Sequence, residues 1–500
     1  MALYLKAKKL DVSTGKPLVA LLNEEEATNF GVQAGDKISL TWRGNKTVNI
    51  EVNLSATKIK SGYVGLYEDI WKDADVEINE IMEVHVLSRP DSIIAIKKKL
   101  LGGKLNYQEI LSIMKDVSDN RLTSVGITYF VAASYFYPYT NDELYFMAKA
   151  MAETGEILKF GKGIVADKHS VGGLAGNRTT MVVIPIVASL GIKIPKTSSR
   201  AITSPAGTAD TMEVLAPVSF SAEEMKEIVN KVGGCLVWGG GFNLAPADDK
   251  ILQVTHPLSL EPYDKMIVSI MAKKIAASVT HLVIDMPVGE TTKVPTQKDA
   301  LEIKRKFEYI AKKYGIKIKV IITKDSDPVG HGIGPALEAR DVMRVLQQKE
   351  NRPLDLEAKA LRLAGELLEL CGKAKNGQGL KLATAQLKSG AAAKKMAEIM
   401  KIQGGKADLD SESVVIGAIK QYVNSERSGK IKMVNNKKIN DICRILGAPG
   451  DKLAGVYLNK EIGDTVKTGE RLYTLYARNE ARMSLAKEAI KNKKMSIFEF

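Results

Sequence analysis

The stretch ADKHSVGGLAGNRTT, residues 166–180, decides the fold of the central part of this chain. A strand predicted over Gly163–Ala166 runs into a turn with three glycines, and a helix is predicted over Thr180–Leu190. Glycine lets backbone N–H groups approach an anion, and a helix N-terminus adds partial positive charge. The stretch predicts either an anion-binding loop or a tight structural turn, and Lys168 and Ser170 would be additional donors to an anion.

A second polar segment strengthens the anion-binding interpretation. It reads KTSSRAITSPAGTADTME, residues 196–213, and is dense in serine and threonine. Alone it would also suit a polar surface loop with ordinary helix caps. Two hydroxyl-rich, glycine-bearing turns near helix starts fit a double phosphate site better. Neither turn has the GK[ST] ending of a Walker A loop, so we do not expect ATP-type phosphoryl transfer.

Further segments supply carboxylates and lysines. Asp248 and Asp249 precede Glu261 in the chain. Ser269 and Lys273 lie four residues apart, on one face of a predicted helix, although an ordinary amphipathic helix would look the same. These segments offer acids and cations near the two polar turns.

The pattern along the whole chain predicts a multidomain α/β protein. Period-two alternation broken by turn residues indicates an N-terminal β-barrel-like domain, and capping patterns indicate a helical domain after it. Alternating strands and helices then indicate an α/β domain with an active-site cleft at its strand ends. The predicted parts are 1–84 (β-rich), 85–160 with part of 190–220 (helical), 161–345 (α/β core), 346–425 (helical continuation) and 426–500 (C-terminal α+β module).

Composition excludes several classes of protein. The 500 residues carry a net charge of +14, but aromatic residues are only 6%, which argues against a nucleic-acid-binding surface. No apolar run approaches the roughly 20 residues of a membrane helix, and the N-terminus does not resemble a secretory signal, so we expect a cytoplasmic protein. The three cysteines form no CxxC pair, so we expect neither a disulfide framework nor a zinc site.

Taken together, these segments resemble the thymidine phosphorylase family. The run KHSVGG, residues 168–173, is similar to the family's phosphate loop. Within the family, the run SRAITSPAGTAD, residues 199–210, and the β-rich first 84 residues resemble the archaeal AMP phosphorylases. The nucleoside-specific members have a glycine-rich variant of that second run. The resemblance covers essentially the whole chain.

The resemblance implies a reaction and an assembly. A nucleoside 5′-monophosphate and inorganic phosphate would give free base and ribose 1,5-bisphosphate, with AMP the leading substrate and CMP and UMP also expected. Phosphate would be a co-substrate, with no cofactor, metal, membrane or nucleic-acid partner. The helical and α/β domains would flank the cleft of a homodimer or larger assembly. The alternative is a pyrimidine or thymidine nucleoside phosphorylase.

Position by position, the resemblance also implies site residues. Glu261 stands where the archaeal enzymes usually have aspartate as proton donor, and Asp248 and Asp249 are the runners-up. Lys168 and Ser170 match phosphate-binding positions, and Lys273 matches a base-contacting lysine. Arg200 and Lys293 are candidate cations for the 5′-phosphate, with Arg178 a weaker third. Contacts to nucleotide and phosphate are implied for Gly173, Ser199, Arg200, Ala201, Ile202, Thr203, Ser204, Thr208, Ser269 and Lys293.

Overall fold

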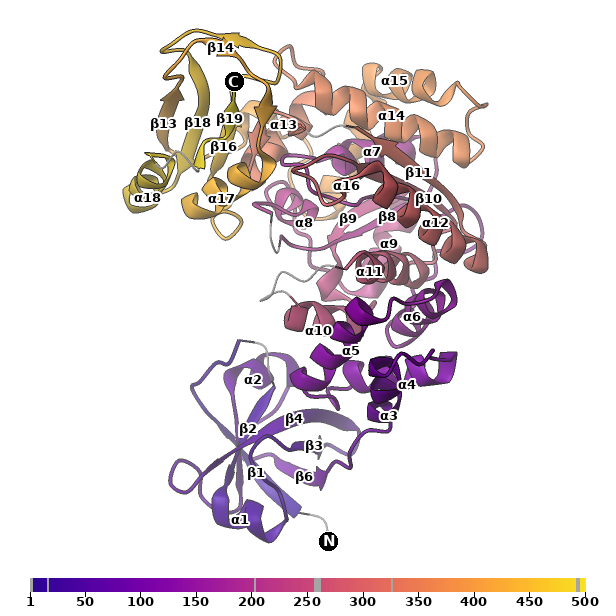
Figure 1. The fold of residues 1–500 in the computed structure, drawn as a ribbon, viewed down its shortest axis with the longest axis vertical. Coiled ribbons are helices and arrows are strands. Elements are labelled where there is room, and N and C mark those ends of the chain that lie inside the picture. Colours follow the sequence, from indigo (N-terminus) through magenta and orange to yellow (C-terminus); the bar gives the residue numbers. More distant parts are fainter. Residues whose placement is uncertain (1–2, 16–17, 202–203, 256–261, 325–326, 492–494) are drawn as a thin grey trace. The chain divides into compact units, whose positions relative to one another are not determined.

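The computed structural model describes residues 3–15, 18–201, 204–255, 262–324, 327–491 and 495–500 (Figure 1). They divide into two compact units, each described here by itself. Unit 1 is Met1–Thr154 with Ala245–Ser269, and unit 2 is Gly155–Leu244 with Ile270–Phe500.

Unit 1 begins with a closed six-stranded barrel in the order β1-β5-β2-β4-β3-β6. Strand β1 alternates buried and exposed residues, and its leucines and alanine point into the barrel core. The strands are β1 (Leu3–Lys9), β2 (Val19–Asn23), β3 (Lys37–Trp42), β4 (Lys46–Ser55), β5 (Tyr63–Leu66) and β6 (Ile81–Val86), with the short helices α1 (Glu24–Asn29) and α2 (Glu68–Ala74).

A helical bundle follows in unit 1. Its helix α6 opens with the predicted capping box, in which Glu143 N donates to Thr140 Oγ1 at 3.2 Å and Thr140 N donates to Glu143 at 2.8 Å. The Glu143 carboxylate also accepts from the buried Lys99 ammonium at 2.9 Å. The helices are α3 (Ser92–Leu100), α4 (Tyr107–Ser118), α5 (Ser124–Phe136), α6 (Asn141–Glu153), α10 (Pro246–Thr255) and the first part of α11 (Tyr263–Ala276).

The sequence-based placement of part of residues 190–220 in the helical domain is wrong. Those residues form β8 (Ile194–Ser198), which pairs in parallel with β9 (Gly234–Trp238) of unit 2, and the short helix α8 (Thr208–Met212). Helix α10 joins the bundle instead, because it packs against α4, α5 and α6.

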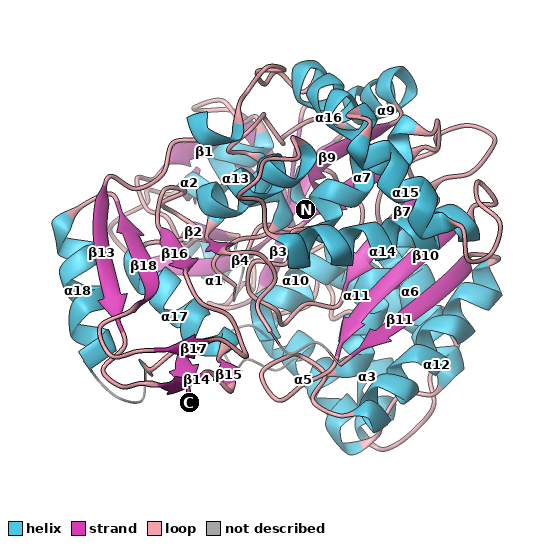
Figure 2. Ribbon diagram, turned by 90° about the horizontal axis from the view of Figure 1, so that it is seen from above, coloured by secondary structure: helices cyan, strands magenta, loops and turns pink. Residues whose placement is uncertain are grey.

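Unit 2 is built on parallel strands. Three form a sheet in the order β11-β10-β7, and the β8–β9 pair lies next to β7 through the bridge between Val165 and Lys193. Helix α14 packs on β10 and α12 packs on β11 (Figure 2). Strand β7 starts at Ala166, later than predicted. It continues through the polar residues Asp167 and Lys168, because ion pairs allow these two side chains to be buried. The strands of the sheet are β7 (Ala166–Ser170), β10 (His281–Pro287) and β11 (Lys317–Thr323).

The helices of unit 2 enclose a large apolar core. Helix α7 (Thr179–Ser189) is buried along almost its whole length and packs against α14 and α16. Helix α12 starts at Gln297, because Thr296 caps its first turn by accepting from Asp299 N at 3.1 Å. The remaining helices are α9 (Ala222–Val232), α12 (Gln297–Tyr314), α13 (Pro335–Leu346), α14 (Leu354–Leu370), α15 (Gly379–Lys388) and α16 (Ala391–Ile402), with the 3-10 turns η1 (Gly239–Gly241) and η3 (Ser411–Ser413).

The C-terminal part of unit 2 is an α+β module with its own apolar cluster. Strand β12 from the central part of the chain is the edge of its sheet, which runs β12-β16-β18-β13. Two small ladders, β14–β17 and β15–β19, complete it. The elements are β12 (Gly332–Ile333), β13 (Ile419–Asn424), β14 (Gly429–Lys430), β15 (Met433–Val434), α17 (Asn436–Leu446), β16 (Gly455–Leu458), β17 (Thr465–Val466), β18 (Arg471–Ala477), α18 (Glu480–Lys491) and β19 (Phe498–Glu499).

Within the described ranges, no helix combines the length and the apolar character needed to cross a membrane. Cys235, Cys371 and Cys443 are all buried free thiols.

Candidate active site

The candidate site of unit 2 lies where β7 and β10 end. In the parallel register of these strands, Ser170 is the partner of Asp285. The glycine-rich turn follows Ser170 directly and leads into α7. The carboxyl ends of parallel strands are the usual place for ligands in such sheets, so the predicted loop stands at the expected edge.

A ring of hydrogen bonds connects the strand ends to the first turn of α7. The Lys168 ammonium donates to Thr179 Oγ1 at 2.7 Å, and the Thr179 hydroxyl donates to Asn177 Oδ1 at 2.9 Å. Asn177 Nδ2 lies 3.3 Å from both Ser170 Oγ and Asp285 Oδ2, and Ser170 Oγ donates to Asp285 Oδ2 at 2.9 Å. Lys168 Nζ closes the ring at 3.8 Å from Asp285 Oδ2. We call these five residues the Lys168–Asp285 ring.

The two charged members of the ring are both buried. Burial lowers the pKa of Lys168 to about 8, against the opposing effect of Asp285 and with the help of the positive charges of Lys359 and Arg178. Burial alone would raise the pKa of Asp285, but Lys168, Lys359 and the hydrogen bonds from Ser170 and Asn177 outweigh it and bring the pKa below its usual value. Asp285 is therefore ionised at neutral pH.

A second buried cluster lies behind the ring. Lys196 Nζ is 3.2 Å from Asp167 Oδ1 and donates to the carbonyl of Lys168 at 2.8 Å, while Lys274 Nζ is 2.5 Å from Asp167 Oδ2. Burial lowers the pKa of Lys196 to about 7, opposed by Asp167. In the two clusters three buried lysines and the half-buried Lys359 face two buried aspartates, an imbalance that favours an anion at this edge. The lysines are Lys168, Lys196, Lys274 and Lys359, and the aspartates are Asp167 and Asp285.

The glycine-rich turn is held against the loop that carries Lys293. Gly173 has φ +98°, and a Cβ placed there would lie 2.4 Å from the backbone nitrogen of Lys293, so only glycine fits. Asn436 of α17 links the same two loops, because it accepts from Ala175 N at 2.8 Å and donates to Thr291 Oγ1 at 2.9 Å. The predicted residues Gly173 and Lys293 are thus brought together.

Arg178 connects the glycine-rich turn that follows Ser170, here called the first loop, to the polar segment within residues 196–213, here called the second loop. Its guanidinium pairs with the buried carboxylate of Glu338 and donates to the carbonyl of Ala206 at 2.9 Å and to Thr208 Oγ1 at 3.3 Å. Thr211 Oγ1 donates to the same carboxylate at 2.9 Å. Arg178, the weaker candidate for the 5′-phosphate, therefore already links two loops and one helix.

The second loop is fixed by acidic residues of α8 and its end. Asp210 Oδ2 accepts from Ala201 N at 2.7 Å and from Gly207 N at 2.8 Å, which closes the loop at both sides. Arg200 forms a two-pronged pair with Glu213 at 2.6 and 2.7 Å. Its guanidinium also lies over the ring of Trp238, 5.0 Å from the centroid.

The other predicted residues of this loop are Ser199, Ile202, Thr203 and Ser204. Ser199 is exposed at the loop's start, and Ser204 donates to the carbonyl of Ala206 at 3.0 Å. Ile202 and Thr203 lie outside the described residues.

In unit 1, Ser269 Oγ donates to Asp248 Oδ2 at 2.6 Å. Asp248 is completely buried, while Asp249 is exposed. Ser269 and Lys273 both lie in α11, as predicted, but Glu261 lies outside the described residues.

Sequence reasoning missed several residues that build the site. Asn177 and Thr179 stand inside the quoted stretch, and Asp285 follows the apolar run of residues 282–284, so the polar character of these residues beside apolar neighbours could have marked them. Lys359 and Glu338 lie on helices far along the chain, where nothing local marks them.

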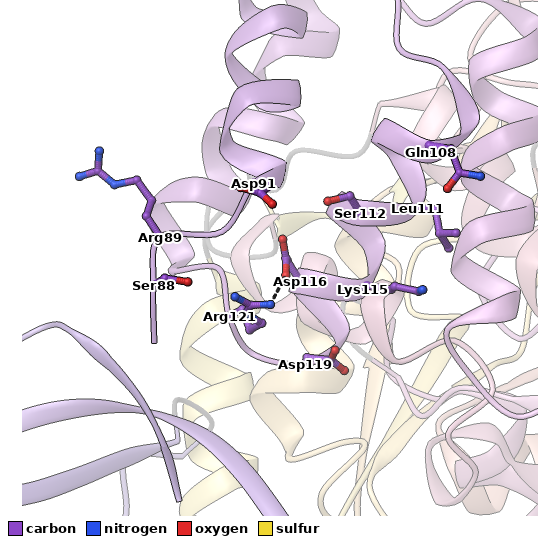
Figure 3. Close-up of a pocket in the computed structure, with 10 residues that line it drawn as sticks. All are labelled: Ser88, Arg89, Asp91, Gln108, Leu111, Ser112, Lys115, Asp116, Asp119 and Arg121. Atoms are coloured by element: carbon purple, nitrogen blue, oxygen red, sulfur yellow. Dashed lines mark ion pairs between the residues drawn. The ribbon is translucent and has the colours of Figure 1, made fainter. Parts of the chain in front are cut away.

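The pocket shown in Figure 3 lies in unit 1, where the segment after the barrel meets α4. It encloses about 330 Å³ and mixes acidic and basic side chains, among them Arg121, 3.6 Å from Asp116. None of the predicted site residues that the structure describes lines it, so it is not the candidate active site.

Comparison with known proteins gives a consistent picture. Residues 162–393 match the glycosyl transferase family, a/b domain, residues 94–155 match the helical bundle domain of the same family, and residues 430–496 match the pyrimidine nucleoside phosphorylase C-terminal domain. The chain is 39% identical to an AMP phosphorylase of Methanocella arvoryzae, with 99% of this chain and 97% of that protein covered. It is 41% identical to one of Thermofilum pendens, with 95% and 91% covered.

The solved structures share a fold with part of the chain. Anthranilate phosphoribosyltransferase from Thermus thermophilus aligns with TM-score 0.52 at 19% identity, covering 62% of this chain and 99% of that one. The Saccharomyces cerevisiae enzyme of the same name aligns with TM-score 0.51 at 14% identity, covering 62% and 98%. At these identities the likeness extends to the fold alone.

The lowered pKa of Lys168 predicts a pH dependence of anion binding. Sulfate carries no proton between about pH 6 and 9 and should favour the protonated lysine, so its binding takes up a proton. Sulfate affinity measured by calorimetry should therefore weaken as pH rises through about 8. In Lys168→Met the step near pH 8 should be absent, whereas Lys196→Met should keep it. A wild-type affinity that stays flat from about pH 7 to 9 would contradict the charge assignment.

Proposed function

We propose, from the premise that this chain belongs to the family of the AMP phosphorylases, that it catalyses the reversible phosphorolysis of AMP. The bond between C1′ and the base nitrogen breaks, a bond from C1′ to a phosphate oxygen forms, and the nitrogen gains a proton. The products are adenine and ribose 1,5-bisphosphate. The observation that carries the proposal is identity near 40% over nearly the full length of several AMP phosphorylases. CMP and UMP are proposed as further substrates.

The nucleophilic phosphate is proposed to bind at the ends of β7 and β10. The excess of buried lysine charge supports this assignment, as does the glycine-rich turn, where backbone N–H groups can approach an anion. Preorganised donors of this kind stabilise the charge that moves between phosphate, sugar and base in the transition state. Lys168, Ser170, Gly173, Ser199 and Thr208 have this role in the proposal.

The 5′-phosphate is proposed to bind the second loop. Ser204 offers a hydroxyl group, and Ala201, Ile202 and Thr203 complete the run. Arg200 and Lys293 are the proposed cations. Because Arg200 pairs with Glu213, the 5′-phosphate would compete with or share that guanidinium. A second anion pocket is what would separate a nucleotide enzyme from a nucleoside enzyme.

The general acid is proposed to be Glu261. A purine leaves poorly unless it is protonated, and a carboxylic acid with a raised pKa can supply the proton. Asp248, a runner-up, is fully buried and accepts the hydroxyl proton of Ser269, which supports a role in positioning Ser269. Ser269 and Lys273 are proposed to contact the nucleotide.

A nucleoside-specific enzyme is the second candidate, because the C-terminal match is to a domain named for pyrimidine nucleoside phosphorylases. We also propose that inorganic phosphate is the only addition the reaction needs, and that the protein works in the cytoplasm as a homodimer or larger assembly, as the family resemblance implies.

The first test measures base release from AMP and from adenosine, each with and without inorganic phosphate. Adenine should appear from AMP only when phosphate is present, and adenosine should be inert because it lacks the 5′-phosphate. A chain that cleaves uridine, cytidine or thymidine and leaves AMP intact would establish the second candidate instead.

The second test substitutes the proposed acid. Glu261→Gln should lower kcat on AMP by roughly 10²–10⁴-fold, because the amide cannot donate a proton to the leaving base. Glu261→Asp keeps the acid and should retain much of the activity. As a control, Glu227→Gln changes an exposed carboxylate on α9 that the proposal gives no role, and it should have little effect. Equal losses in Glu261→Gln and Glu261→Asp would point to a role other than proton donation.

A further inference from the structure

Each hydrogen bond of the Lys168–Asp285 ring has a fixed direction. An ammonium group can only donate, and an ionised carboxylate can only accept. The carboxylate of Asp285 can only accept, so Asn177 must face it, and Ser170 beside it, with its donor Nδ2. Asn177 Oδ1 is thereby turned toward Thr179, whose hydroxyl accepts from Lys168 and donates its own proton to that oxygen.

The same logic fixes the proton of Ser170. Asp285 is completely buried, and its Oδ2 accepts the Ser170 hydroxyl at 2.9 Å, while Oδ1 lies 3.7 Å from Lys359 Nζ. A serine hydroxyl has one proton and two lone pairs. Its proton is committed to Asp285 and one lone pair faces Asn177, so the remaining lone pair of this half-buried side chain can only accept.

We infer that Asp285 is a positioning residue that makes Ser170 a hydrogen-bond acceptor for the P–OH group of inorganic phosphate, so that this site distinguishes phosphate from sulfate. The inference rests on the proposed function, in which Ser170 contacts the nucleophilic phosphate. Near neutral pH, inorganic phosphate keeps at least one proton and sulfate keeps none. An acceptor at Ser170 therefore gives phosphate a hydrogen bond that sulfate cannot make, although both anions have the same shape.

The arrangement also orients the nucleophile. When the P–OH oxygen is held by Ser170, the proton-free oxygens, which are the better nucleophiles, are directed away from Ser170. Asp285 performs this function through Ser170 without touching the phosphate. No bond to the protein forms or breaks, and the phosphate proton stays on the phosphate.

The test is calorimetric binding of inorganic phosphate and of sulfate to the full chain at neutral pH and constant ionic strength. The wild type should bind phosphate at least about tenfold more tightly than sulfate, the difference expected of one hydrogen bond to a charged partner. Ser170→Ala should weaken phosphate by about tenfold and change sulfate by less than about twofold. Ser189→Ala is the matched control, because its hydroxyl donates to the carbonyl of Ile186 and both affinities should stay unchanged.

Two variants of Asp285 separate positioning from folding. Asp285→Ala frees the Ser170 proton for donation to an anion, so the preference for phosphate should collapse. Asp285→Asn keeps an oxygen that can accept from Ser170 and should restore the preference. If Asp285→Ala does not fold, Ser170→Ala still decides the question.

The contrary results are distinct. If Ser170→Ala weakens phosphate and sulfate equally, Ser170 is a donor and the inference is overturned, while the proposed function stands. If the wild type binds neither anion, the proposed phosphate site is wrong and the inference falls with it. If Asp285→Ala keeps the wild-type preference, Asp285 does not set the role of Ser170.

Discussion

The buried ion pair between Lys168 and Asp285 is the interaction on which unit 2 depends. Taking an ammonium group out of water costs several kcal/mol unless a carboxylate and further hydrogen bonds compensate it. Asp285 supplies the charge from β10, and Thr179 supplies an acceptor from α7. One side chain therefore joins two strands and the first turn of a helix, and the glycine-rich turn between them has little freedom left.

Buried polar side chains also hold the loops that lie farther from the strand ends. Glu338 holds Arg178, which binds the second loop, and Asp210 closes that loop from inside. Asn436 joins the first loop to the one that carries Lys293. The loops are thus fixed by buried polar side chains before any ligand binds. Preorganisation of this kind is what a phosphorylase needs, because groups that are already oriented need not reorganise during the reaction.

The sequence predicted the parts of the fold that local patterns encode. The glycine-rich turn, the capping box of Thr140 and Glu143, and strands such as Lys37–Trp42 follow from residues close together in the chain. The start of β7 was misplaced because Asp167 and Lys168 look like loop residues, and only distant partners such as Lys196 and Asp285 allow them to be buried. The helical segment Pro246–Thr255 could not be assigned to unit 1, because its partners are far away in sequence.

The sequence identified the loops that form the candidate site, but it did not show which partner each side chain has there. Gly173 packs against Lys293, which was predicted as a cation for the 5′-phosphate, and Arg178 and Arg200 already pair with glutamates, which no local pattern reveals. The roles of all the site residues, including Ile202, Thr203 and Glu261, remain predictions.

The most direct measurement follows the oxygen atoms of phosphate. AMP is incubated with the chain and ¹⁸O-labelled inorganic phosphate, and the products are examined by ³¹P NMR. If phosphate itself attacks C1′, ribose 1,5-bisphosphate should form with the full label on its 1-phosphate, including the oxygen that bridges to the sugar. Ribose 5-phosphate as the product, with all of the label left in free phosphate, would show that water is the nucleophile and would contradict phosphorolysis.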